Sequence, residues 1–120
     1  MSLRITSLAD AGEPQKERLV MRASSDVEVG KYAVFCCWIA DDGDPLSGDL
    51  PAAYWFEDFS VKSGDLVVLY TKVGKRSEKV SDSGRTSHFC YWNKTGSIWT
   101  KDKQPVLTFA SPWHRVPKAG

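Results

Sequence analysis

The sequence predicts an all-β fold in which short strands pack as a sandwich or a barrel. Residues 66–71 form an apolar, β-prone run that follows the turn signal at 63–65, a pattern typical of a central buried strand. The aromatic run at 88–92 is its expected partner. No stretch has convincing helical periodicity, so we expect about six to eight strands joined by turns.

The length of 120 residues suits a single domain, with the core at 3–110 and a C-terminal tail at 111–120. The hydrophobic content of 42% and the charged content of 26% are ordinary for a globular chain, whereas the aromatic content of 12% is high. Large aromatic side chains fill the space between sheets and also line binding surfaces. The net charge of +1 gives no bulk field that would draw the chain to nucleic acid or to a membrane.

Three cysteines, two of them adjacent, argue against a secreted disulfide scaffold. On a strand Cys36 and Cys37 point to opposite faces and cannot share a partner, so we expect buried, reduced thiols. The first residues lack the basic and then apolar stretches of a signal peptide, and no run approaches the ~20 apolar residues of a membrane span. We therefore expect a cytoplasmic protein without membrane contact.

The first half of the chain carries three strand patterns. Residues 3–7 alternate weakly, as an edge strand does. Residues 17–23 alternate apolar and charged side chains and predict a half-buried strand, with a short helix as the alternative. Residues 32–39 are almost continuously apolar and predict a strand covered on both faces. Polar loops are expected at 24–31 and 41–51.

The second half continues the pattern. Residues 54–56 predict a short aromatic strand or a plug over one end of the core. Residues 72–86 are polar and predict a long, mobile connector. A turn at 93–96 and a last strand at 105–110 follow, and we expect Trp113 to cap the core from outside.

Several motifs follow one another in a familiar order: Arg18-Leu19-Val20-Met21-Arg22, Tyr54-Trp55-Phe56, Ser63-Gly64-Asp65-Leu66-Val67-Val68, Tyr91-Trp92-Asn93, Ile98-Trp99, Lys101-Asp102 and Val106-Leu107. This order resembles the lamin-tail domain family. The resemblance covers most of residues 4–110 and implies an immunoglobulin-like antiparallel β-sandwich that acts as an interaction module. The family shares no catalytic site, so no functional residue is carried over. The chain departs from the family pattern at 23–24 and 29–32, and its connector at 72–86 is longer.

Charge is polarised along the chain. Residues 72–103 hold eight basic and three acidic residues, whereas residues 41–65 hold one basic and seven acidic residues. Basic residues interleaved with aromatic ones suit phosphates and stacked bases, although a solvated loop beside core tryptophans is the plainer interpretation. The candidate partner or polyanion surface consists of Lys72, Lys75, Arg76, Lys79, Arg85, Tyr91, Trp92, Lys94 and Trp99.

The loop at 41–51 carries a candidate acidic patch, which consists of Asp41, Asp42, Asp44 and Asp49. Carboxylates bind calcium, but the spacing lacks the regular Asp-x-Asp-x-Asp-Gly pattern and the distant Glu, so ordinary turn aspartates are the plainer interpretation. An acidic patch can also meet the basic patch of a second copy, which makes self-association a real alternative.

His88 and Cys90 share one strand face and form a candidate pocket for a Cys–His dyad or a metal. The chain has only one other histidine, His114, and no Cys-x-x-Cys spacing, so a buried thiol beside a partly exposed imidazole is the plainer interpretation. No Gly-rich phosphate loop, nucleophile elbow or pair of catalytic carboxylates occurs in the sequence. We assign no catalytic, cofactor-binding or metal-binding residue.

The sequence thus predicts a non-enzymatic interaction module that binds a protein partner or a second copy of itself. The first alternative is nucleic-acid or polyanion binding through residues 72–103, which predicts an affinity that falls steeply with salt. The second is a small enzyme or ligand-binding protein with a pocket at His88 and Cys90, which predicts a reactive thiol near neutral pH.

Overall fold

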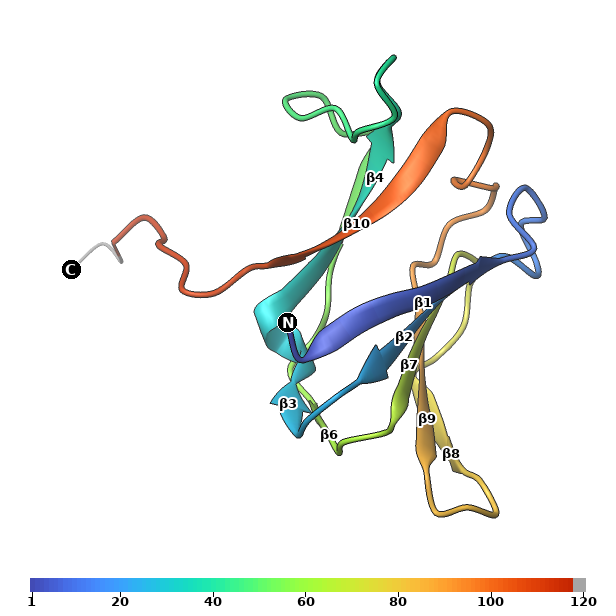
Figure 1. The fold of residues 1–120 in the computed structure, drawn as a ribbon, viewed down its shortest axis with the longest axis vertical. Helices are drawn as coiled ribbons and strands as arrows, with labels where there is room; N and C mark the ends of the chain where they lie inside the picture. Colours follow the sequence, from blue (N-terminus) through green and yellow to red (C-terminus); the bar gives the residue numbers. More distant parts are fainter. Residues whose placement is uncertain (118–120) are drawn as a thin grey trace.

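The computed structural model describes residues 1–117, which form three open β-sheets without an α-helix (Figure 1). The five-stranded sheet has the order β1-β2-β7-β9-β8, the three-stranded sheet the order β10-β4-β5, and β3 and β6 pair with each other. The strands are β1 Leu3–Ala9, β2 Arg18–Ala23, β3 Val27–Glu28, β4 Tyr32–Trp38, β5 Ala52–Trp55, β6 Ser60–Val61, β7 Leu66–Tyr70, β8 Ser77–Val80, β9 Thr86–Tyr91 and β10 Lys103–Phe109. A short 3-10 helix, Val29–Lys31, links β3 to β4. The all-β prediction is confirmed.

β7 and β9 are neighbours, as the two apolar runs predict, but they run parallel. The expected antiparallel pairing holds for the other pairs of strands, but this parallel pair makes the main sheet mixed. The reason lies in the connector. Parallel neighbours need a crossover of about a dozen residues or more, and the chain between Tyr70 and Thr86 is long enough to supply it.

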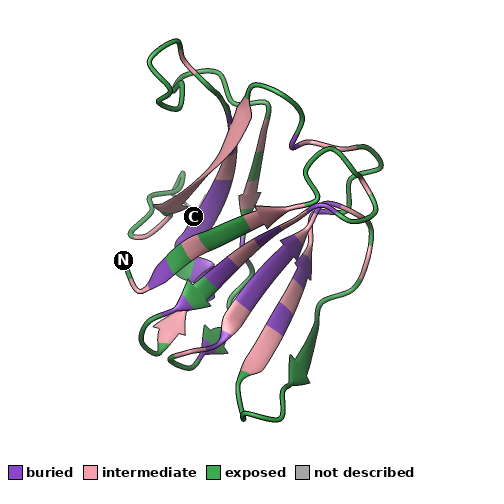
Figure 2. Cartoon of the chain, turned by 45° about the vertical axis from the view of Figure 1, so that its right-hand side comes forward, coloured by how far each residue is buried: buried purple, intermediate pink, exposed green. Residues whose placement is uncertain are grey.

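That connector contains β8, which pairs antiparallel with β9 at the outer edge of the sheet. The expectation of an irregular mobile connector is wrong for these four residues. All of them are exposed, so no apolar alternation marks the strand in the sequence (Figure 2). Backbone pairing with β9 holds β8 in place.

The inward faces of the two larger sheets share one core. In β2, Leu19 and Met21 are fully buried, which confirms the alternation expected there. In β4, Tyr32, Val34 and Cys36 point into the same core, which also includes residues of β7 and β9 (Figure 2). Because side chains alternate along a strand, each larger sheet also has an outer face that looks away from this core.

Three further features differ from expectation. β3 lies in a segment predicted to be a loop, and its partner β6 in a segment for which no strand is predicted, because two-residue strands leave no periodic signal. Trp113 does not cap the core: it is 59% exposed and meets Trp55 edge to face, with ring centroids 6.2 Å apart. β1 carries a bulge between Ile5 and Ser7. Cys36, Cys37 and Cys90 are free and buried, as expected.

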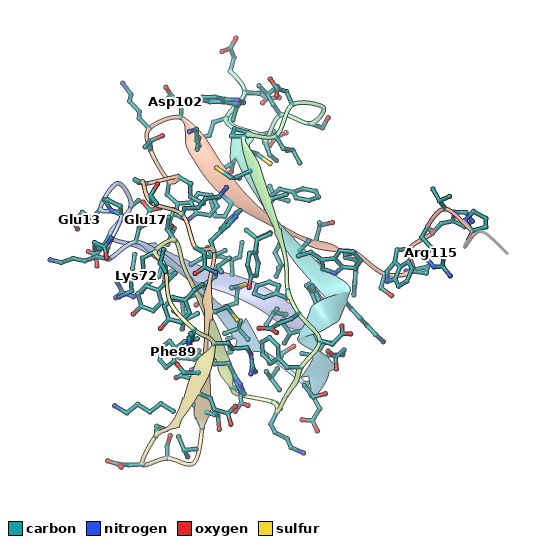
Figure 3. The ribbon with its side chains drawn as sticks, turned by 180° about the vertical axis from the view of Figure 1, so that it is seen from behind. Glu13, Glu17, Lys72, Phe89, Asp102 and Arg115 are labelled. Carbon is teal, nitrogen blue, oxygen red and sulfur yellow. The ribbon has the colours of Figure 1, made fainter. Side chains whose placement is uncertain are left out.

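A buried carboxylate joins segments that are far apart in the sequence. Glu17, at the start of β2, is fully buried (Figure 3). Its side chain accepts hydrogen bonds from the hydroxyl groups of Thr71 and Ser97 and from the backbone N–H groups of Gly12, Ile98 and Trp99. Burial raises the pKa of Glu17, but these hydrogen bonds outweigh it and hold the pKa below the ordinary value. Through these hydrogen bonds Glu17 links the irregular segment 93–102 to the main sheet.

Within residues 1–117, no helix has the length and apolar character needed to cross a membrane.

Candidate interaction surfaces

The outer face of the three-stranded sheet, here called the apolar face, is built on the middle strand β4. Ala33, Phe35 and Cys37 alternate with the core residues and point outward. The register places Ala53 of β5 and Val106 of β10 on either side of Phe35. Two residues back along β4, Trp55 and Thr108 flank Ala33 in the same way.

Two shallow cavities meet at Phe35 and hollow this face. One, of about 230 Å³, lies between β4 and the β4–β5 loop and is lined by Leu46 and Leu50 among others. The other, of about 320 Å³, is bounded by Trp55 and Phe109. Together they form an apolar groove that follows β4.

Exposed hydrophobic side chains gather around this sheet. Seven of the eleven large hydrophobic side chains exposed in residues 1–117 lie on its strands, in the β4–β5 loop or just after β10: Trp38, Ile39, Leu46, Leu50, Trp55, Phe109 and Trp113. By register Trp55 lies on the apolar face, whereas Trp38 and Phe109 share the side of the core residue Tyr32 and border the face from there. Clustered exposed apolar side chains mark interaction sites, whereas single exposed ones do not.

The rim of the apolar face is acidic. At one end stands the β4–β5 loop with the predicted patch, and Asp41, Asp42, Asp44 and Asp49 are all exposed there. At the other end Glu57 and Asp58 line a cavity beside Trp55 and Trp113. Asp42 accepts a hydrogen bond from the backbone N–H of Asp44, as an ordinary turn aspartate does. No group of three or more potential metal-ligating side chains occurs in the described part of the chain.

The outer face of the five-stranded sheet, here called the basic face, has an apolar and aromatic centre. Tyr70 of β7 lies beside Tyr91 of β9, and Val68 lies beside Phe89. The rings of Tyr70 and Tyr91 stack with centroids 5.5 Å apart and planes 12° apart. Val20 of β2 pairs with Val68 and extends the apolar centre toward β1.

Basic side chains surround this centre. Arg4 of β1 and Arg22 of β2 are register partners, and both are exposed. Arg18 forms a salt bridge with Asp10 at 2.8 Å. The ammonium group of Lys72 lies 4.8 Å from the ring centroid of Tyr70, and Lys72 and Phe89 lie on the side of the sheet turned away from β4 (Figure 3). Lys79 of β8 completes the set on the far edge.

The structure divides the predicted basic surface into several places. Lys72, Lys79 and Tyr91 belong to the basic face. Trp92 and Trp99 are core residues, 9% and 3% exposed, and their rings contact each other.

The other predicted basic residues lie elsewhere. The guanidinium group of Arg76 lies 3.8 Å from the ring centroid of Phe59, which packs against the core, and not on the basic face. Lys75, Arg85 and Lys94 are exposed in loops outside the strands.

Sequence reasoning missed Arg4, Tyr70 and Phe89 as site residues. Their neighbours on the basic face come from strands that are distant in the sequence, so only the sheet order brings them together. A partial signal existed, because the alternation in 17–23 already turns Arg18 and Arg22 toward solvent.

His88 and Cys90 do share one face of β9, and both are buried. His88 is 5% exposed, more buried than the sequence suggested. Its Nε2 lies 3.0 Å from Oδ2 of Asp65, and its Nδ1 lies 3.2 Å from the Glu78 carboxylate. Burial raises the pKa of Asp65, but hydrogen bonds from His88 and from the backbone of Lys62 and Thr86 hold it below the ordinary value.

Cys90 has the environment of a structural thiol. Burial raises its pKa to about 11, and the nearby Arg76 only partly offsets this effect. A nucleophilic cysteine needs the opposite shift, because the thiolate is the reactive form.

We expect the three thiols of the folded protein to react slowly with a thiol reagent such as DTNB. Because the pKa of Cys90 is raised from 9.0 to about 11, its thiolate fraction at pH 7.4 is about 100-fold below that of an ordinary cysteine. Burial raises the pKa of Cys36 and Cys37 as well. Stopped-flow absorbance would measure the rate, with the protein in denaturant as the control that releases three equivalents. A fast phase of one equivalent in the folded protein would revive the enzyme alternative.

No described protein family and no curated protein matches this chain in sequence.

Proposed function

We propose that this chain is a non-enzymatic protein-binding module that docks a protein surface on its apolar face. One observation carries the proposal: most of the exposed large hydrophobic side chains of the described chain gather on and around one three-stranded sheet. The core of a protein interface is depleted in charge and enriched in aromatic residues, and its rim is polar. The apolar face has this arrangement, with Phe35 and Trp55 in the groove and carboxylates around it.

The same proposal includes the chemistry of the partner. The exposed carboxylates at both ends of the groove favour a surface with an apolar centre and a basic rim, because complementary potentials speed encounter and suppress wrong partners. Phe35 and Trp55 are the expected anchors, since aromatic side chains dominate the energetics of most interfaces.

For the fold, we propose that the two larger sheets make an immunoglobulin-like sandwich similar to the lamin-tail domains. A core shared by the inward faces of both sheets supports this proposal. An experimental structure compared strand by strand with a lamin-tail domain would test it. A different strand order or connectivity would reject it.

Photo-crosslinking at single positions tests the function. We would place p-benzoylphenylalanine at Trp55, which is exposed on the apolar face, and at Ser83, in the exposed β8–β9 turn, as the matched control. In cells that make the protein, we expect protein adducts from position 55 at several times the yield from position 83. Phe35→Asp, which places a charge in the groove, should remove them. Equal yields at the two positions, or no protein adducts, would reject the proposal.

A further inference from the structure

We propose that the partner of the apolar face is the basic face of a second copy of this chain, so that copies add head to tail. The inference rests on the proposed function, because it names the partner of the same face. Each copy would present its apolar face to one neighbour and its basic face to the other.

The two faces lie on opposite sides of the molecule. Both are outer faces of sheets whose inner faces line the same core, so they look away from each other. A contact between two different surfaces of one protein is heterologous, and it leaves a free surface at each end of the pair. Further copies can then add, unless the rotation between neighbours closes a ring.

The charges of the two faces are opposite in sign. The rim of the apolar face carries six exposed carboxylates: Asp41, Asp42, Asp44, Asp49, Glu57 and Asp58. The basic face carries Arg4, Arg18, Arg22, Lys72 and Lys79. Two apolar faces pressed together would oppose like charges, and so would two basic faces, whereas one of each kind pairs opposite charges.

The two centres also match in polarity. The groove at Phe35 and Trp55 is apolar, and so is the centre of the basic face at Val20, Val68 and Phe89. An apolar centre within a ring of charge is the usual anatomy of a protein interface. When the two faces join, the apolar surface at both centres is buried from water, which favours association.

The rings of the basic face favour a protein over a single-stranded nucleic acid. Base stacking needs a free ring face. Tyr91 already stacks on Tyr70, and a Cβ on Gly74 would lie 2.4 Å from the Tyr91 ring, so the backbone there is packed against it. Lys72 lies over the Tyr70 ring. With Trp92 and Trp99 in the core, the aromatic surface left for bases is small.

The faces are modest in size, so we expect a weak and reversible contact. Strands about 4.8 Å apart make a five-stranded face roughly 20–25 Å across, near the small end of specific interfaces. The wild-type chain should therefore form larger species only at concentrations of tens to hundreds of micromolar. Salt should dissociate them, because the rim charges are exposed.

Two variants, each with one face altered, test the proposal directly. The basic-face variant combines Arg4→Glu with Arg22→Glu, two adjacent exposed positions. The apolar-face variant combines Leu46→Lys with Asp49→Lys, both exposed in the β4–β5 loop. The control, Lys62→Glu with Arg85→Glu, makes the same charge change as the basic-face variant at two exposed positions in the β6–β7 and β8–β9 turns. Circular dichroism and thermal melting establish that each variant is folded.

Sedimentation velocity then gives the mass of each sample. We expect the wild type and the control to grow with concentration, and each face variant alone to stay monomeric, with a dissociation constant raised about 30-fold or more. An equimolar mixture of the two face variants keeps one intact pair of faces, so it should form a dimer that grows no further. That stop at the dimer distinguishes head-to-tail contact from every symmetric arrangement.

Four results would overturn this inference. A wild-type chain that stays monomeric at 1 mM, roughly ten times the concentration at which association is expected, would reject it. So would a basic-face variant that still dimerises, because the contact would then join two apolar faces. A mixture that stays monomeric while the wild type associates would place the interface elsewhere. A monomer that gains mass only with oligo(dT), and loses this gain in the basic-face variant, would make the basic face a nucleic-acid site. In each case crosslinks from position 55 to another protein would leave the proposed function standing.

Discussion

Glu17→Gln is expected to lower the free energy of unfolding by about 3 kcal/mol, the range for a buried charged group that loses its hydrogen bonds. The carboxylate accepts from five donors and donates to none. An amide of the same size turns an NH₂ group toward some of these donors, so buried N–H and O–H groups lose their acceptor. Urea unfolding followed by tryptophan fluorescence would measure the change.

The same substitution should alter the pH dependence of stability. The pKa of Glu17 is lowered in the folded state, so its stabilising contribution is complete above the unfolded pKa of about 4.3 and is lost as pH falls through the folded pKa. The difference between the wild type and Glu17→Gln should therefore be largest near pH 7 and shrink in acid. Asp65, whose pKa is also lowered, leaves part of the acid sensitivity in the variant. A constant difference from pH 7 to pH 2 would contradict this account.

Gly30→Ala is expected to destabilise the protein by about 2 kcal/mol, typical of overpacking at a site that cannot relax freely. A Cβ at this position would lie 2.9 Å from Cα of Asp58 and 2.0 Å from its carboxylate. The carboxylate can swing away, but the backbone atom cannot. The carbonyl oxygen of Gly30 also accepts from the indole N–H of Trp55, so the shift would reach the apolar face.

Gly96→Ala is the matched control, because a Cβ at that position would meet nothing within 4 Å. We expect Gly96→Ala to leave stability unchanged or slightly higher, since alanine restricts the unfolded chain more than glycine does. Thermal melting of the two variants side by side would compare them. Equal losses at both positions would mean that the close approach to Asp58 is not the cause.

Most strands could be predicted because burial alternates along them. β2 shows its period in the sequence, since every second residue enters the core, and β4 is recognisable as a continuous apolar run whose residues are mostly buried. β8 could not be found, because backbone pairing alone defines it and its side chains stay in water. The parallel pairing of β7 and β9 depends on how the chain crosses over between the two strands. The local residue pattern of a strand does not indicate the direction of its neighbour.

The candidate surfaces were only partly predictable for the same reason. The acidic loop is contiguous in sequence, so its four aspartates could be identified directly. The basic face takes Arg4, Arg22 and Lys72 from three strands or strand ends, and only the sheet order brings them together. Composition also could not separate Trp92, a core residue, from Trp55, an exposed one, because both stand in aromatic, β-prone runs.

The bulge in β1 has a consequence for how copies of this chain meet. β1 is the outermost strand of the main sheet, where a free row of backbone N–H and C=O groups could extend by pairing with another chain. The extra residue at Thr6 breaks the regular spacing of that row, and the Thr6 hydroxyl donates back to the carbonyl oxygen of Val20. Continuous ladder growth, the route to cross-β fibrils, is thus disfavoured at this edge. Association at this edge would then depend on contacts between side chains, which salt weakens and which substitutions can test.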